Sequence, residues 1–113
     1  MNLQKMMQEA QRLQAKLKEE MARAQEELAA EEIEGSAGGG LVRVTMNGHK
    51  QLVRVQIDPT AVDPEDVETL EDLVFAAVQS ALSLAEDRAA EVMSRVQGGL
   101  GLPGGVDLSG LMG

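Results

Sequence analysis

The chain has 113 residues, a formal net charge of −9, no cysteine, and Phe75 as its single aromatic residue. This length predicts one domain, and the lack of cysteine excludes disulfides, thiolate metal sites and a cysteine nucleophile. Because aliphatic side chains bury less area than aromatic ones, a monomer of this size would be marginally stable, and we expect further burial in an oligomer.

Residues 1–10 lack the apolar core of a secretory signal peptide, and no apolar run approaches the eighteen or so residues of a membrane span. We therefore expect a cytoplasmic protein with no membrane partner. The negative net charge, taken alone, also argues against nucleic acid and other anionic partners. The distribution of the charges along the chain modifies that conclusion.

A long helix is expected over residues 3–32, which contain no Gly or Pro and consist mainly of strong helix formers. Such a helix reaches about 45 Å, whereas a compact chain of this length has a radius of gyration of only about 13–14 Å. The helix must therefore project from its domain or lie against a second chain. Its apolar residues recur at heptad-like spacing with one stutter, and they are Leu3, Met6, Ala10, Leu13, Leu17, Met21, Ala24 and Leu28. This stripe is typical of a seam that packs in a helical dimer or against the chain's own domain.

The N-terminal part of this helix is locally basic on an acidic molecule. Half of the ten basic residues lie in the first 23 positions, namely Lys5, Arg12, Lys16, Lys18 and Arg23. The acidic residues concentrate later, in residues 26–34 and 58–72.

Glycines at positions 35 and 38–40 end the helical pattern, and residues 33–36 could form a short strand. The glycine run predicts a loop. It does not resemble a phosphate-binding loop, because no Lys-Ser/Thr pair follows and no helix begins after it.

Two strands are predicted at residues 41–46 and 51–57, where apolar side chains alternate with polar ones. Between them, Asn47 and Gly48 are expected to supply the positive φ angles of a tight hairpin, with Gly48 and His49 as the central residues.

This hairpin register places Val44 opposite Val53 on one face of the sheet and Arg43 opposite Arg54 on the other. Like charges that face each other across a ladder are unfavourable. Either a neighbouring carboxylate neutralises the two arginines, or they bind an anionic ligand.

A second helix is predicted from Pro64 to Gln97, with Asp63 as its N-cap and acidic residues in its first turn. Its middle, residues 73–85, is apolar almost all round. We expect the hairpin to cover one side of it and a partner chain another. Residues 98–113 are rich in glycine and are predicted to form a flexible tail whose scattered apolar residues leave room for a docking peptide.

No catalytic or metal-binding pattern stands out. His49 is the only histidine, and no second His or Cys completes a zinc site. The acidic residues near the second helix lack the spacing of a calcium loop, and capping accounts for them. We therefore expect no enzymatic activity, no metal and no cofactor.

The order of several segments resembles the YbaB/EbfC family over essentially the whole chain. These segments are residues 6–14 (MMQEAQRLQ), 41–48 (LVRVTMNG), 55–59 (VQIDP), 70–77 (LEDLVFAA) and 102–104 (LPG). The resemblance implies an α+β fold of order α-β-β-β-α, in which two long helices project as arms from a small antiparallel sheet in an intertwined homodimer. Residues 1–97 would form this dimerising DNA-binding domain, with residues 98–113 as its tail.

The resemblance further implies a bacterial nucleoid-associated protein that binds double-stranded DNA through basic residues on its arms. The matching positions here are Lys5, Arg12, Lys16, Lys18 and Arg23, with Arg88 and Arg95 on the second helix as further candidates. Such a protein would be located in the cytoplasm, on the nucleoid, and would serve chromosome organisation or gene regulation. The alternative is an acidic homodimeric adaptor that binds other proteins and has no direct DNA role. Its net acidity and methionine-rich arm favour that alternative, because methionine adapts to varied surfaces.

Overall fold

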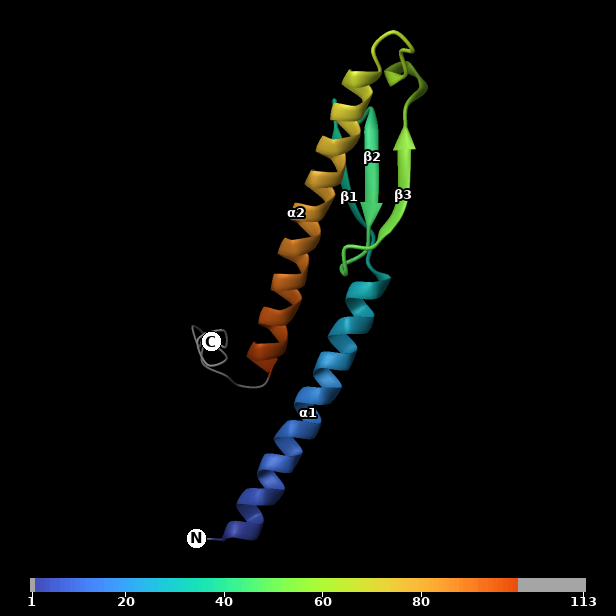
Figure 1. Cartoon of the computed structure of the whole chain (residues 1–113). Helices are drawn as coiled ribbons and strands as arrows, with labels where there is room; N and C mark the ends of the chain where they lie inside the picture. Colours follow the sequence, from blue (N-terminus) through green and yellow to red (C-terminus); the bar gives the residue numbers. More distant parts are fainter. Residues whose placement is uncertain (1, 100–113) are drawn as a thin grey trace.

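A computed structural model of the chain describes residues 2–99 and has the predicted α-β-β-β-α order (Figure 1). Its elements are α1 (Leu3–Ala30), β1 (Ile33–Ala37), β2 (Val42–Met46), β3 (Leu52–Ile57), the short 3-10 helix η1 (Pro59–Ala61) and α2 (Val67–Gly99). The three strands form one antiparallel sheet in the order β1-β2-β3. The predicted fold class is confirmed.

The first helix projects from the body, as its length requires. The molecule measures 77 × 25 × 19 Å, and its radius of gyration is 20.7 Å, well above the roughly 13 Å of a compact chain of this size. Every residue from Asn2 to Glu19 is exposed. Figure 1 shows this part of α1 continuing beyond the end of α2. We call residues Leu3–Glu19 the arm.

The core lies between the sheet and α2. Val42, Val44 and Met46 of β2 alternate toward the helix, where they pack against Ala77 and Ala81. All five residues are buried. The apolar alternation predicted for residues 41–46 is therefore confirmed by the burial of one face of β2.

The third strand is different, because α2 packs over β1 and β2 and not over β3. Val55 lies opposite Val44, and Ile57 lies opposite Val42, so both are on the side of the sheet that faces the helix. They are nevertheless 42% and 40% exposed. The edge strand thus leaves an apolar surface uncovered in the single chain.

Close contact between β1 and α2 depends on Gly35. A Cβ atom at this position would lie 2.8 Å from the carbonyl oxygen of Ala77 and closer still to the backbone of Ala81. Because these are backbone atoms, no side-chain rotation can make room. A chain with one aromatic residue builds its core by bringing backbones together across small residues.

The hairpin between β2 and β3 differs from the prediction. Asn47 and Gly48 do not have positive φ angles; Lys50 does, at 64°. The Asn47 side chain organises the turn by accepting hydrogen bonds from the backbone N–H groups of His49 and Gln51, at 2.9 and 3.0 Å. These hydrogen bonds of the Asn47 side chain favour a longer loop than the two-residue turn that the Asn-Gly dipeptide predicts.

The predicted register is also wrong, because the longer loop and a bulge at Val53 shift β3 by two residues. Val44 pairs with Val55, Arg43 with Gln56, and Arg54 with Thr45. The two arginines therefore do not face each other directly. Arg43 lies 3.8 Å from the carboxylate of Glu34 on β1.

The start of α2 is three residues later than predicted, and Asp63 is not its N-cap. Asp63 instead forms a turn before the helix, in which its side chain accepts from the N–H of Glu65 at 2.9 Å. Asp66 caps the helix by accepting from the backbone N–H and the hydroxyl of Thr69, at 3.3 and 2.7 Å. Asp63 and Asp66 can each cap a helix, and the turn that Asp63 forms with Glu65 leaves Asp66 as the N-cap of α2.

The predicted tail, residues 98–113, falls almost entirely outside the described residues. Gly98 and Gly99 belong to α2, and residues 100–113 lie outside the part of the chain that the structure describes. Within residues 2–99, neither helix combines the length and the apolar character that a membrane crossing requires.

Replacing Gly35 with alanine should push β1 away from α2 and lower the free energy of unfolding by about 2–3 kcal/mol, the usual cost of overpacking a core. Urea denaturation followed by circular dichroism measures this change. Gly98→Ala is the control, since a Cβ atom there meets no atom within 4 Å and alanine favours a helix. Equal stability of Gly35→Ala and the wild type would show that the backbone contact is not limiting.

Candidate nucleic-acid interface

Four basic side chains form one row along α1. Lys5, Arg12, Lys16 and Arg23 are separated by seven, four and seven positions, which places them within a sector of about 40° on a helix. The row is about 27 Å long and lies about 120° around the helix from the apolar stripe. Lys18 lies outside this sector. We call these four residues the basic row.

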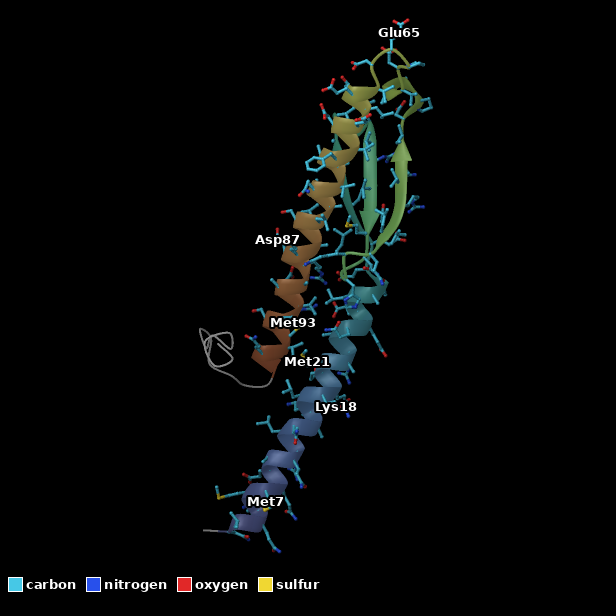
Figure 2. All side chains as sticks on the ribbon, viewed as in Figure 1. Met7, Lys18, Met21, Glu65, Asp87 and Met93 are labelled. Carbon is cyan, nitrogen blue, oxygen red and sulfur yellow. The ribbon has the colours of Figure 1, made fainter. Side chains whose placement is uncertain are left out.

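The arm carries cations that have no acidic partner in the part of the chain that the structure describes. Among residues 2–99, no carboxylate lies within 4 Å of the side-chain nitrogens of Lys5, Arg12, Lys16 or Lys18. Arg23 differs, because it pairs with Glu19 at 2.8 Å and with Glu20 at 3.4 Å. Figure 2 shows Lys18 and Met7 on the part of α1 that extends past the end of α2.

The arm also exposes the apolar stripe. Leu3, Met6, Leu13 and Leu17 are all exposed, from 41% at Leu17 to 70% at Leu3. The same stripe is buried only farther along α1, where it meets α2. The sequence allows the stripe to pack either in a helical dimer or against the chain's own domain. Packing against the chain's own domain accounts only for the C-terminal part of the stripe.

The segment Glu20–Ala30, which we call the arm root, attaches the arm to the body. Ala24 and Leu28 pack against Val92 and Val96 of α2 in a small buried cluster. Met21 and Ala89 flank this cluster. The contact is narrow, because most of its side chains are small.

The hairpin turn holds the arm root from a second side. The backbone N–H of Gly48 donates to the carbonyl oxygen of Leu28 at 2.8 Å. Nε2 of His49 lies 3.0 Å from the carbonyl oxygen of Gln25, which can only accept a hydrogen bond. The turn therefore contacts carbonyl groups in the last two turns of α1, and that of Leu28 is among the last four, which have no i+4 partner within the helix. His49, predicted as a central residue of the turn, is exposed and makes one of these contacts.

Gly48 is required for this docking rather than for a positive φ angle. A Cβ atom on Gly48 would come within 2.6–2.9 Å of three atoms of Leu28. The sequence indicated a turn at Gly48, but it did not show that this glycine would pack against a helix.

Arg88 is predicted to bind DNA, but the structure places it in a network of carboxylates at the arm root. Its Nε donates to both carboxylate oxygens of Glu31 at 2.7 Å. Its terminal nitrogens reach Glu27 at 3.2 Å and Glu91 at 3.0 Å. All three nitrogens of the guanidinium thus have acidic partners.

Arg95, the other predicted contact on α2, joins the same network. Its Nη2 lies 2.7 Å from the carboxylate of Glu27, which it shares with Arg88. We call Arg88, Arg95, Glu27 and Glu31 the root clamp. Sequence reasoning missed its acidic half, because Glu27 and Glu31 look like ordinary exposed acids until α1 docks on α2.

The contacts in the clamp shift the pKa values of Glu31 and Arg88. Hydrogen bonding from Arg88, aided by its charge, holds the pKa of the Glu31 carboxyl below its ordinary value of 4.5 against the opposing effect of partial burial. The same hydrogen bonds to Glu31 and Glu91 raise the pKa of Arg88. Both groups are therefore charged at neutral pH.

The opposite end of the molecule is strongly acidic. Residues 58–72 contain seven acidic side chains and no basic one. In Figure 2, Glu65 lies at this end and Met7 near the other. Charge is thus separated along the long axis, with the free cations of the arm at one pole. Within residues 2–99, no group of three or more His, Cys, Asp or Glu side chains is placed to hold a metal ion.

A projecting helix whose outer cations have no carboxylate partner among residues 2–99, on an acidic body, defines a binding protein suited to an extended polyanion. The chain belongs to the YbaB/EbfC DNA-binding family, whose model matches residues 1–100.

Bacterial relatives agree with this assignment. A nucleoid-associated protein of Thermoanaerobacter pseudethanolicus is 48% identical over 103 residues, which cover 91% of this chain and 89% of the relative. One from Moorella thermoacetica is 51% identical over 85 residues, or 75% of this chain and 82% of the relative. The crystal structure of an uncharacterized protein from Helicobacter pylori superposes with a TM-score of 0.66 at 24% identity. It covers 82% of this chain and 94% of its own and shares the fold.

Removing the Glu31 carboxylate should weaken the root clamp in a pH-dependent way. The folded-state pKa of Glu31 is lowered, so its stabilising effect is fully present above the unfolded value near 4.5 and is lost as the pH falls through the folded value. Glu31→Gln should therefore lower the free energy of unfolding by about 1 kcal/mol at pH 7, as for a partly exposed ion pair. As the pH falls below 4.5 and through the lowered folded-state pKa, the difference from wild type should shrink toward zero. Chemical denaturation at several pH values tests this, and a difference independent of pH would contradict it.

Proposed function

We propose that this protein is a nucleoid-associated protein that binds double-stranded DNA as a homodimer through its projecting arms, without enzymatic activity. Membership of a DNA-binding family and the nucleoid-associated relatives support this function. The observation that carries it is the concentration on the arm of four cations, Lys5, Arg12, Lys16 and Lys18, that have no carboxylate within 4 Å among residues 2–99. In the cell such a protein would be located on the nucleoid, in chromosome organisation or gene regulation.

The basic row is suited to contacts with phosphates. Lysine and arginine side chains on a straight helix reach the DNA backbone without entering a groove, and such contacts carry no sequence information. Each contact releases condensed counterions, so binding should weaken steeply with added salt. A dimer repeats the row by twofold symmetry and grips DNA at two places.

The acidic pole limits where DNA can bind. The seven acidic side chains of residues 58–72 repel phosphates from that end. The field of the whole molecule therefore favours an approach of DNA to the arm. This separation reconciles a net charge of −9 with an anionic partner.

Two uncovered apolar surfaces support a homodimer. The first is the outer part of β3, where Leu52, Val53, Val55 and Ile57 are all at least 40% exposed. The second is a shallow groove on α2 that Leu70, Val74, Phe75 and Val78 line with Glu71. Phe75, the one aromatic side chain, is 66% exposed. Exposed apolar patches of this kind mark association surfaces, and a twofold interface would bury each of them twice.

One observation favours the adaptor function as a second candidate. The exposed apolar residues of the arm, with Met6 and Met7 among them, are 41–70% exposed. A partner protein could pack against this stripe. The adaptor needs the stripe and not the basic row, so charge variants separate the two functions.

Reversing two charges of the basic row should remove DNA binding. We expect Arg12→Glu/Lys16→Glu to weaken the binding of a duplex by roughly tenfold or more at low salt and to flatten the plot of log K against log salt concentration. Mobility shift or fluorescence anisotropy at two salt concentrations measures both quantities.

The matched control is Arg43→Glu/Arg54→Glu, which makes the same change in net charge on the exposed face of the sheet. It should retain most of the binding. Equal losses in both variants would mean that net charge matters and the arm does not. Failure of the wild type to bind duplex at low salt would exclude DNA as its ligand.

The dimer predicts a change of mass when the apolar surfaces become charged. Val55→Asp and Phe75→Asp should each convert the dimer to a folded or partly unfolded monomer, because a buried unpaired carboxylate costs more than the lost contact. Light scattering after size exclusion gives the mass. Gln56→Asp, on the opposite face of β3, should remain a dimer. A wild type that is monomeric at micromolar concentration would refute the homodimer.

A further inference from the structure

The two arginines of α2 that the sequence offers as DNA contacts lie where they can hold the arm instead. The Nε of Arg88 donates to both carboxylate oxygens of Glu31 at 2.7 Å, and its terminal nitrogens contact Glu27 and Glu91. Its side chain is only 28% exposed. A phosphate could reach this guanidinium only by displacing a carboxylate.

Arg95 is more exposed, but it too has a short contact, 2.7 Å from Nη2 to a carboxylate oxygen of Glu27. Glu27 thus receives both arginines, and Glu31 receives Arg88. Glu27 lies in the last turn of α1 and Glu31 is the residue that follows the helix, four positions later, while the two arginines are seven positions apart on α2. The clamp therefore ties the end of α1 to about two turns of α2.

The other contacts at the root leave the direction of the arm weakly determined. The buried cluster consists of Ala24, Leu28, Val92 and Val96, and two helices that touch along such a narrow line can roll or tilt against each other. The hairpin turn bonds the carbonyl groups of Gln25, Leu28 and Ala29 and packs against Leu28, so it holds α1 near its end and not along the arm. The ion pairs of Arg88 and Arg95 with Glu27 and Glu31 lie beside this apolar line of contact. They therefore resist rotation of α1 about its own axis relative to α2.

Small rotations at the root have large effects along the arm. The arm is about 25 Å long, so a tilt of 10° at the root moves its free end by about 4 Å. This displacement exceeds the distance over which a lysine or arginine keeps a hydrogen bond to a phosphate. The direction of the basic row therefore depends on the clamp.

We propose that Arg88 and Arg95 are positioning residues, which fix the direction and roll of the DNA-binding arm through Glu27 and Glu31 and do not themselves bind DNA. The inference rests on the proposed function for its effect on DNA, while its structural part stands apart from DNA. If loss of the clamp leaves each arm in the binding direction for about a fifth of the time, the apparent affinity falls roughly fivefold per arm.

A charge-neutralising variant distinguishes positioning from direct contact, because the two roles predict opposite signs. Glu27→Gln/Glu31→Gln removes two negative charges and frees both arginines. If the arginines bind phosphate, this variant should bind DNA more tightly. If they position the arm, it should bind roughly fivefold or more weakly despite its more positive charge.

The control is Glu26→Gln/Glu32→Gln, which changes the charge equally within the same part of the chain. Glu26 and Glu32 are exposed, and neither has a basic partner within 4 Å among residues 2–99. This control should bind as tightly as the wild type or slightly more tightly. Circular dichroism and light scattering confirm that all variants keep their fold and mass. Binding by Glu27→Gln/Glu31→Gln that equals or exceeds that of the control overturns the proposal.

A second measurement needs no DNA and separates this inference from the proposed function. The chain has no cysteine, so Ala15→Cys on the arm and Ser36→Cys on β1 accept two spin labels specifically. Pulsed electron paramagnetic resonance, with labelled chains diluted into unlabelled ones, gives the distribution of distances between the labels. It should broaden in the Glu27→Gln/Glu31→Gln background and stay narrow in the control. An unchanged distribution refutes the positioning role, whether or not the wild type binds DNA.

Discussion

The packing of small residues along α2 is the constraint on which the rest of the structure depends. The first half of α2 brings Ala77 and Ala81 against the backbone of β1 at Gly35. The second half brings Val92 and Val96 against Ala24 and Leu28 of α1. The sheet and the root of the arm thus both pack against α2. Because the chain has a single aromatic residue, these contacts depend on close approach of backbones rather than on large buried side chains.

This construction explains why the single chain looks incomplete. A core of valine and alanine in one layer covers β1 and β2, but it leaves the apolar side of β3 and the Phe75 side of α2 exposed. Among residues 2–99, no other element covers the arm. The exposed apolar surfaces and the exposed arm both follow from the small core, and both agree with the proposed homodimer that binds DNA at two symmetric positions.

The arrangement of the charges follows the same division. Acidic side chains gather at the start of α2, and the cations of the arm lie at the other pole. The cations nearest the root, Arg23, Arg88 and Arg95, are each paired with glutamates. Within the described residues, the cations farther out on α1 and Arg54 on β3 have no carboxylate within 4 Å. The arginines at the arm root are therefore paired with glutamates, whereas the outer lysines and Arg12 are presented to solvent.

Sequence patterns predicted both long helices and the strands β2 and β3, left β1 as a possibility, and did not predict η1. The full α-β-β-β-α order came from the family resemblance. The absence of Gly and Pro predicted the long α1, and alternation predicted β2 and β3 within one residue of their observed ends. The hairpin register was wrong, because the side chain of Asn47 and the left-handed residue Lys50 lengthen the loop in a way that the Asn-Gly signal does not show. The N-cap of α2 was predicted at the wrong residue, because the side chains of Asp63 and Asp66 can both accept hydrogen bonds from backbone N–H groups at the start of a helix.

What the sequence by itself determined, then, is local: helix, strand, apolar stripe and basic row all follow from neighbours within about two helical turns. Only the tertiary structure decided which charges are free, since Glu31 and Arg88 are 57 positions apart and Glu27 and Arg95 are 68 apart. No spacing rule relates residues at such separations. Their contact exists because α2 returns antiparallel along the root of α1, and that return places the two arginines predicted to contact DNA beside the glutamates of the clamp.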